Sequence, residues 1–127
     1  MLMPRKRKIS VEKQLAEVIA LGMQEKKAKN IVSIDFSNIQ NTLFSNFVIC
    51  HGNSRAQVEA IADSVEETVR KATGQKPRYR EGFHNAEWIL LDYIDVVVHI
   101  FQEKYRSFYQ LENLWADAEI SYIDSEK

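Results

Sequence analysis

The sequence predicts a single α/β domain in which a mixed β-sheet of about five strands carries helices packed on it. The chain has 127 residues, a length typical of one domain with one hydrophobic core. A short apolar strand at 47–50 is followed by a turn and a long helical pattern, which is a β-α step. The apolar segments 87–93 and 95–101 are almost contiguous, so they can pair only as an antiparallel hairpin. A sheet with both features is mixed.

The composition excludes several classes of protein. With 45% hydrophobic and 28% charged residues, four Gly and two Pro, the chain is neither collagen-like, low-complexity nor wholly disordered. Cys50 is the only cysteine, so an internal disulfide is impossible, and no run of 18 apolar residues predicts a membrane span. The basic start is not followed by the apolar core of a secretion signal. We therefore expect a cytoplasmic protein.

The first helix is expected near residues 11–27, with Ser10 as its N-cap. Its apolar residues recur at helical spacing: Val11, Leu15, Val18, Ile19 and Met23. Lysines at the far end favour a helix C-terminus there. Residues 31–36 are rich in β-branched side chains and predict a strand, and the polar residues 38–45 predict a loop.

A second helix is expected after the apolar strand at 47–50. Ser54 and Gln57 have the spacing of a capping box, and Gly74 followed by Pro77 supplies the stop. Between them one apolar stripe runs along the helix: Val58, Ile61, Ala62, Val65 and Val69. This pattern is typical of a helix that packs one face on a sheet.

The last part of the chain is expected to form an edge strand at 77–80, the hairpin and a closing amphipathic helix. The closing helix has an apolar residue every three or four positions: Tyr105, Phe108, Leu111, Leu114 and Trp115. We therefore divide the chain into a flexible basic tail at 1–9, a single domain at 10–118 and a polar C-terminal tail at 119–127.

The hairpin carries most of the candidate binding residues. We expect Asp92 to lie opposite Asp95 across the turn. Because side chains alternate along a strand, this register places four residues on one face: Trp88, Leu90, Val97 and His99. Trp88 either packs beneath a helix or points outward as an anchor for a partner, and both interpretations stay open here.

The residue pattern predicts no catalytic, cofactor or metal site. Cys50 and His51 are neighbours on a strand and point to opposite faces, which argues against a nucleophile and its base. Three scattered histidines and one cysteine lack the spacing of a zinc site. Ser54 after Gly52 is expected as a plain N-cap rather than as part of a phosphate site. We expect a protein that is not an enzyme.

The main alternative is a small nucleotidyltransferase that uses Asp92 and Asp95 with Mg²⁺. These two carboxylates are three residues apart and straddle a turn. Ligands that bridge metal ions in such enzymes must project in parallel from one strand. The positions of these carboxylates therefore favour a non-catalytic relative of the nucleotidyltransferase fold over an active enzyme.

Charge is distributed unevenly along the chain. Residues 1–29 hold eight Lys/Arg and three Asp/Glu, residues 30–86 hold six of each, and residues 87–127 hold three against nine. A net charge of −1 argues against free nucleic acid as the main target and favours a protein partner. A basic run is a candidate contact to RNA phosphates, and an RNA-binding module centred on it is a third interpretation: Arg5, Lys6, Arg7 and Lys8.

The hairpin and the closing helix together resemble the ribosomal silencing factor family, also called the Iojap family. The resemblance runs from about residue 11 to residue 118. It rests on segments that occur in a fixed order: Gly52-Asn53-Ser54, Ala86-Glu87-Trp88, Leu91-Asp92, 95–101 and 106–115. Each segment alone is weak, whereas the ordered combination is specific.

The resemblance implies a nucleotidyltransferase-like α/β fold without catalytic residues. It also implies a translational repressor that binds the large ribosomal subunit through its protein fourteen. Such a protein blocks association with the small subunit and lowers translation when nutrients are short. Whether the free protein is a homodimer stays open.

Individual residues follow from the same resemblance. Trp88, Asp92 and His99 match family positions on or beside the partner-facing sheet, so we expect them to contact the partner. Three others match the signature of the closing helix and are assigned mainly to the fold: Tyr109, Glu112 and Trp115. The family commonly has glycine in the hairpin turn where this chain has Ile94.

Overall fold

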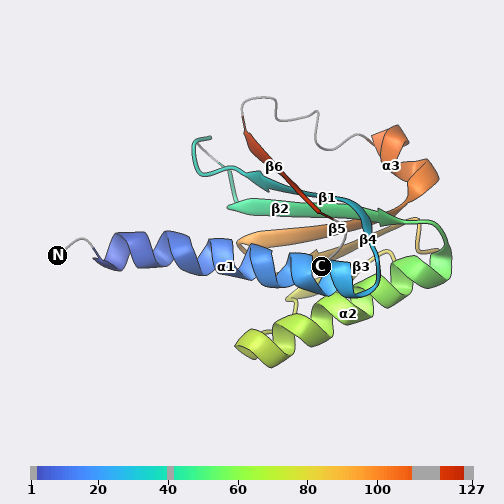
Figure 1. The fold of residues 1–127 in the computed structure, drawn as a ribbon, viewed down its shortest axis with the longest axis horizontal. Helices are drawn as coiled ribbons and strands as arrows, with labels where there is room; N and C mark the ends of the chain where they lie inside the picture. The colour runs from blue at the N-terminus through green and yellow to red at the C-terminus, as the bar shows by residue number, and fades with distance from the viewer. Residues whose placement is uncertain (1–2, 40–41, 110–117, 125–127) are drawn as a thin grey trace.

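The computed structural model describes residues 3–39, 42–109 and 118–124, and the side chains of 13–39, 42–106 and 118–124. It contains one sheet with two long helices on one of its faces (Figure 1). The elements follow in the order α1 (Met3–Glu25), β1 (Lys29–Asp35), β2 (Asn46–Gly52), α2 (Arg55–Thr73), β3 (Tyr79–Glu81), β4 (Trp88–Asp92), β5 (Val96–Gln102), α3 (Glu103–Tyr109) and β6 (Glu119–Ile123).

The sheet is mixed, as predicted, and has the strand order β3-β4-β5-β2-β1-β6. Strands β2 and β5 are parallel, and every other neighbouring pair is antiparallel. The sheet has six strands rather than about five. The sixth is β6, which pairs with β1 within the segment expected to be a polar tail. Its sequence Glu-Ile-Ser-Tyr-Ile contains three residues that favour strands, and assigning 119–127 to a polar tail overlooked them.

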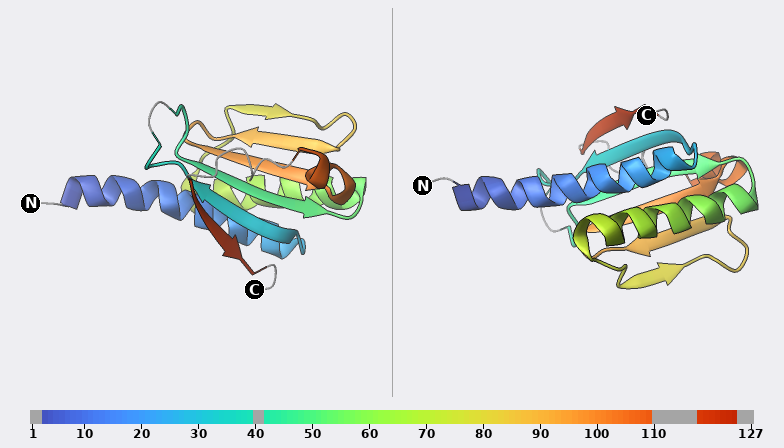
Figure 2. Two further views of the ribbon diagram at one scale, coloured as in Figure 1. Left: turned by 90° about the horizontal axis from the view of Figure 1, so that it is seen from above. Right: turned by 60° about the horizontal axis from the view of Figure 1, so that its bottom comes forward.

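Helix α1 begins at Met3 and not near Val11 as expected. Residues 3–9, which we expected to be a flexible tail, therefore belong to the helix. Lysine, arginine and methionine are good helix formers, and Pro4 is tolerated because it lies in the first turn. The N-terminal part of α1 extends past the end of the sheet (Figure 2).

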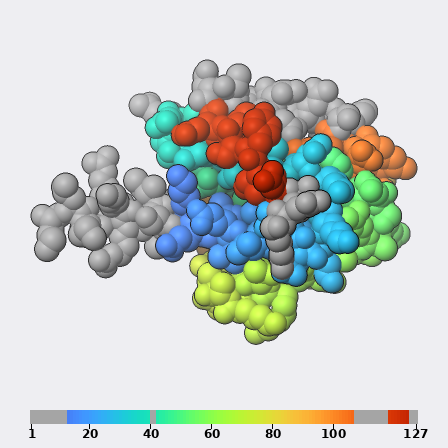
Figure 3. Space-filling view, in the orientation of Figure 1, coloured from blue at the N-terminus to red at the C-terminus, as the bar shows by residue number. Residues whose placement is uncertain are grey.

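The larger hydrophobic core lies between the sheet and helices α1 and α2. The predicted stripe of α2 is fully buried in it. Gly22 of α1 lies so close to α2 that a Cβ there would come within 2.8 Å of the Cα of Val65. The space-filling view shows α1 between α2 and β6 on this side of the molecule (Figure 3).

The predicted caps of α2 are present. The Ser54 hydroxyl accepts a hydrogen bond from the Gln57 backbone N–H at 3.1 Å. The Gln57 side chain accepts from the N–H of Asn53 at 2.7 Å, and not from that of the N-cap as in the usual capping box. At the other end Gly74 has a φ of 77°, the left-handed conformation that closes a helix. The sequence therefore located both ends of this helix.

A second hydrophobic cluster covers the opposite face of the sheet, which we call the aromatic face. Its buried members are Val32, Ile34, Phe36, Phe47, Ile49, Val97, Phe101 and Ala118. Tyr105 of α3 packs against this cluster. The closing helix was expected to continue to Trp115; its described part ends at Tyr109, and the predicted positions Leu111, Leu114 and Trp115 lie outside the described residues. Within the described residues no helix is both long and apolar enough to cross a membrane.

A candidate docking surface on the aromatic face

The β4–β5 hairpin has the predicted face assignment and a different register. Trp88 lies opposite Phe101, Leu90 opposite His99, and Asp92 opposite Val97. The expected pairing of Asp92 with Asp95 is therefore wrong by two residues. A shift of two preserves the faces because side chains alternate with a period of two. Trp88, Leu90, Val97 and His99 accordingly lie together on the aromatic face.

The turn explains this register. The N–H of Tyr93 donates to the carbonyl of Val96 at 2.9 Å, so Ile94 and Asp95 form the tip of the hairpin. Ile94 takes a φ of 79°, which is unusual for a β-branched residue. We expected Tyr93 and Ile94 at the tip. The backbone hydrogen bond places the tip one residue later, at Ile94 and Asp95.

The carboxylate of Asp92 is held by two neighbours. One oxygen accepts from the Ile94 N–H at 2.7 Å, and the other forms an ion pair with Arg78 at 2.9 Å. Asp95 is exposed at the tip. Among the described residues, no group of three or more His, Cys, Asp or Glu side chains is placed to hold a metal ion. Asp92 therefore stabilises the turn, and its side chain is 18% exposed.

The indole of Trp88 is half-buried on the aromatic face, and not beneath α1 or α2. It stacks on Phe101 with ring centroids 5.1 Å apart and planes 23° apart. Its Nε1–H donates to Nδ1 of His99 at 3.0 Å. Neither α1 nor α2 therefore covers Trp88, and its ring is only partly buried among the described residues.

Two of the predicted contact residues lie deeper than expected. His99 is 3% exposed and Val97 is 9% exposed, whereas Leu90 is half-buried. Burial lowers the pKa of His99 to about 3, so the imidazole is neutral near pH 7. Its other nitrogen, Nε2, is buried without a hydrogen-bond partner among the described residues. The side chains of His99 and Val97 therefore lie beneath the candidate surface and support the more exposed residues on it.

The structure adds exposed residues that the sequence analysis did not select. Tyr79 of β3 lies opposite Asp92, so its half-exposed ring is on the same face of the sheet as Trp88. Ile94 is exposed at the hairpin tip. Strand alternation predicts the face of Tyr79 only once the β3–β4 pairing is known. The candidate docking surface therefore comprises Trp88, Leu90, Asp92, Tyr79 and Ile94.

Cys50 and His51 have separate surroundings, as their neighbouring positions predicted. Cys50 packs in the core beside α1 and α2, and burial raises the pKa of its thiol. His51 lies with α3, where its Nδ1 is 3.1 Å from the guanidinium of Arg106. Arg106 also donates to the carbonyl of Asn30 at 2.6 Å. This pair fastens α3 to the start of β1.

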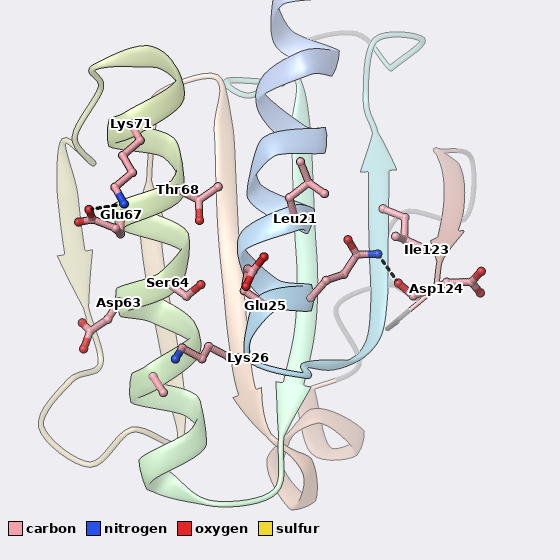
Figure 4. Close-up of a pocket in the computed structure, with 12 residues that line it drawn as sticks. Leu21, Glu25, Lys26, Asp63, Ser64, Glu67, Thr68, Lys71, Ile123 and Asp124 are labelled. Atoms are coloured by element: carbon pink, nitrogen blue, oxygen red, sulfur yellow. Dashed lines mark hydrogen bonds and ion pairs between the residues drawn. The ribbon is translucent and has the colours of Figure 1, made fainter. Parts of the chain in front are cut away.

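A large open groove of about 1250 Å³ lies on the other side of the molecule (Figure 4). It is bounded by α1, α2 and the end of β6, where Gln24 donates to the carbonyl of Asp124 at 2.7 Å. Its charged residues have mixed signs, and Lys71 pairs with Glu67 across 3.5 Å. None of the described residues that line this groove is aromatic, in contrast to the aromatic face.

Comparison with known proteins identifies the family. Residues 9–127 match the family described as ribosomal silencing factor during starvation. This chain belongs to that family. It is 38% identical to the ribosomal silencing factor RsfS of Bacillus subtilis over 113 residues, which cover 89% of this chain and 94% of the relative. It is 37% identical to the chloroplastic protein Iojap of Zea mays over 78 residues, or 57% of this chain and 31% of that protein.

Solved structures similar to this ribosomal silencing factor family member have the same fold. A crystal structure of a Chromobacterium violaceum protein aligns with a TM-score of 0.76 and 29% identity, covering 91% of this chain and 95% of that one. A Bacillus halodurans structure aligns with a TM-score of 0.72 and 33% identity, covering 88% and 98%. The predicted α/β fold class and the predicted family resemblance are both confirmed. The family match also extends past residue 118 and includes β6.

Proposed function

We propose that this chain is a translational repressor that binds the large ribosomal subunit and blocks its association with the small subunit. Protein fourteen of the large subunit is the proposed direct partner, and nutrient limitation is the proposed condition. Membership of the ribosomal silencing factor family supports this role. The observation that carries it is the half-buried Trp88 on the aromatic face, whose indole is held by Phe101 and His99.

Steric exclusion suffices for such a mechanism, and no reaction is needed. A compact chain of 127 residues has a radius of gyration of roughly 14 Å. A body of that size bound at a subunit seam holds the two surfaces apart. To block subunit association, the chain therefore needs only to bind the large subunit and occupy space at the interface, which is consistent with a family of regulators.

The net acidic charge of the C-terminal third of the chain favours a basic partner. Residues 87–127 carry nine Asp/Glu and three Lys/Arg. Ribosomal proteins are generally basic, so the two surfaces attract each other and encounter is accelerated. Added salt should therefore slow capture of the large subunit more than it speeds release.

The basic start of α1 is a proposed peripheral contact to ribosomal RNA. Residues 1–8 lie outside the family match, and the helix carries four successive cations there: Arg5, Lys6, Arg7 and Lys8. Deleting residues 1–9 should reduce the log-log salt slope of binding by about 3 to 4 if all four touch phosphates. Most of the affinity should remain, because the hairpin provides the anchor. Loss of nearly all affinity would instead favour an RNA-binding module.

The decisive experiment is sedimentation of purified large subunits with the protein, followed by addition of small subunits. The wild type should pellet with large subunits and reduce the yield of joined ribosomes. Trp88→Ala should weaken binding by about 2–4 kcal/mol, or about 30- to 1000-fold in Kd, while the chain unfolds cooperatively. Leu21→Ala is the matched control, because Leu21 is a half-exposed apolar residue on α1.

Two results would contradict the proposal. Full joining of subunits at saturating wild-type protein would remove the blocking role. Equal binding by Trp88→Ala and Leu21→Ala would remove the aromatic face as the contact. If Trp88→Ala unfolds, Leu90→Ala tests the same surface with a smaller change in packing, because Leu90 lies beside the indole on β4.

A further inference from the structure

His99 and Trp88 are diagonal neighbours across the hairpin. Leu90 is the residue directly opposite His99, and Trp88 precedes it by two positions on the same strand. Both side chains therefore project from the aromatic face, at the separation that large side chains can bridge. The indole and imidazole centroids are 5.8 Å apart with planes 37° apart. The hydrogen bond between the rings has an ideal heavy-atom distance of 3.0 Å.

The chemistry of the two rings fixes the direction of this hydrogen bond. The indole Nε1–H is only a donor, so Nδ1 of His99 must present its lone pair. An imidazole with a free lone pair on Nδ1 is neutral and carries its proton on Nε2. Accepting the indole hydrogen bond therefore requires a neutral imidazole, and burial of the ring favours the same neutral form.

His99 cannot itself provide much contact area. It is 3% exposed, and the Phe47 ring meets it edge-on with centroids 4.4 Å apart. Its Nε2–H is buried without a partner among the described residues, an arrangement that a hydrophobic side chain of similar size would avoid. The contribution of His99 to the surface is therefore the hydrogen bond that its Nδ1 accepts from Trp88.

Among the described residues, Phe101 and His99 both constrain the indole of Trp88. Phe101 stacks against its face, and His99 accepts from its N–H. Stacking alone permits the ring to slide or flip, because an aromatic face is tolerant of orientation. The hydrogen bond adds a fixed direction within the plane of the ring. Together these contacts hold a partly exposed indole in a single orientation before any partner arrives.

We propose that His99 is a positioning residue for partner binding: its Nδ1 lone pair fixes the indole of Trp88 in the orientation that docks. This inference rests on the proposed function, and it reassigns His99 from a contact residue to a residue that acts through Trp88. An anchor held in its bound orientation loses less conformational entropy on binding than a mobile one.

A matched pair of amide variants tests the proposal. The side-chain oxygen of His99→Asn can occupy the place of Nδ1 and accept from the indole. The amide of His99→Gln reaches the place of Nε2 and leaves the indole without that acceptor. His99→Leu removes all hydrogen bonding. Affinity for purified large subunits is measured by sedimentation, and the Trp88 indole N–H is followed by NMR, with Trp88→Phe used to assign its signal.

His99→Leu and His99→Gln should each weaken binding about 10-fold and speed exchange of the indole N–H with water, as expected for loss of one orienting hydrogen bond. His99→Asn should recover most of both properties. In a Trp88→Phe background, His99→Leu should cause no further loss, because the phenyl ring has no N–H to hold. A merely structural role would give the same additional loss in both backgrounds.

The possible results separate this inference from the function on which it rests. If the wild type fails to bind large subunits, the proposed function and the inference are both overturned. If the wild type binds, Trp88→Phe binds less tightly and His99→Gln binds as well as wild type, only the positioning role is overturned. Should His99→Leu fail to fold, the comparison of His99→Asn with His99→Gln still decides the point. Equal affinity of those two variants contradicts the proposal.

Discussion

The buried neutral imidazole of His99 predicts a measurable dependence of stability on pH. Burial sets its folded-state pKa at about 3, and an unfolded chain has a histidine pKa of about 6.5. Above pH 6.5 the imidazole is neutral in both states, so its contribution to stability is complete. Below pH 6.5 the unfolded chain takes up a proton that the folded chain does not. Stability therefore falls as the pH decreases, by about 1.4 kcal/mol per pH unit down to about pH 3.

Between pH 7.5 and pH 5.0 this single group should lower the free energy of unfolding by about 2 kcal/mol. Urea unfolding followed by far-UV circular dichroism at the two pH values measures the change. His99→Gln cannot titrate, so its loss over the same range should be smaller than that of the wild type by about 2 kcal/mol. Comparing differences removes any general destabilisation that the substitution causes.

His84→Gln is the matched control, because His84 is exposed to solvent on the loop before β4. This variant keeps the buried imidazole of His99, so it should still lose the ~2 kcal/mol between pH 7.5 and 5.0 that His99→Gln does not lose. If His99→Gln loses as much stability on acidification as the wild type does, the prediction that His99 stays neutral in the folded chain is refuted.

Three further substitutions test the local geometry. Ile94→Gly should raise the free energy of unfolding by about 1 kcal/mol, since it removes a β-branched side chain from a φ of 79°, and a lower urea midpoint would contradict this. Gly82→Ala should lower it by at least about 2 kcal/mol and reduce the melting temperature, because φ is 90° and a Cβ would collide with the carbonyl oxygen of Trp88. Ser54→Ala should cost about 1 kcal/mol by removing the N-cap of α2, and an unchanged urea midpoint would show that the cap is dispensable.

The elements that were predicted correctly share a physical cause. The stripe of α2, its cap at Ser54 and its stop at Gly74 depend on residues within a few positions of one another. The hairpin was predicted from two apolar runs with almost nothing between them. Local periodicity also fixed which side chains share a face, because that depends only on odd and even positions along a strand.

The elements that were missed depend on distant partners. Strand β6 is a short segment, Glu-Ile-Ser-Tyr-Ile, and its place in the sheet is set by its pairing with the edge of β1, which lies far away along the chain. The hairpin register was wrong by two residues because the tip lies at Ile94 and Asp95, a position set by backbone hydrogen bonds. The side of the sheet on which Trp88 lies was fixed by how α1 and α2 pack.

The sequence by itself determined the α/β class, the order of strands and helices along the central part of the chain, and the common face of Trp88, Leu90, Val97 and His99. These follow from periodicity and capping, which act over short stretches of chain. Only the tertiary structure decided that His99 lies buried with its lone pair on the indole N–H while Trp88 keeps part of its ring exposed. Burial is a property of what packs above a residue, and that is set by segments far away along the chain.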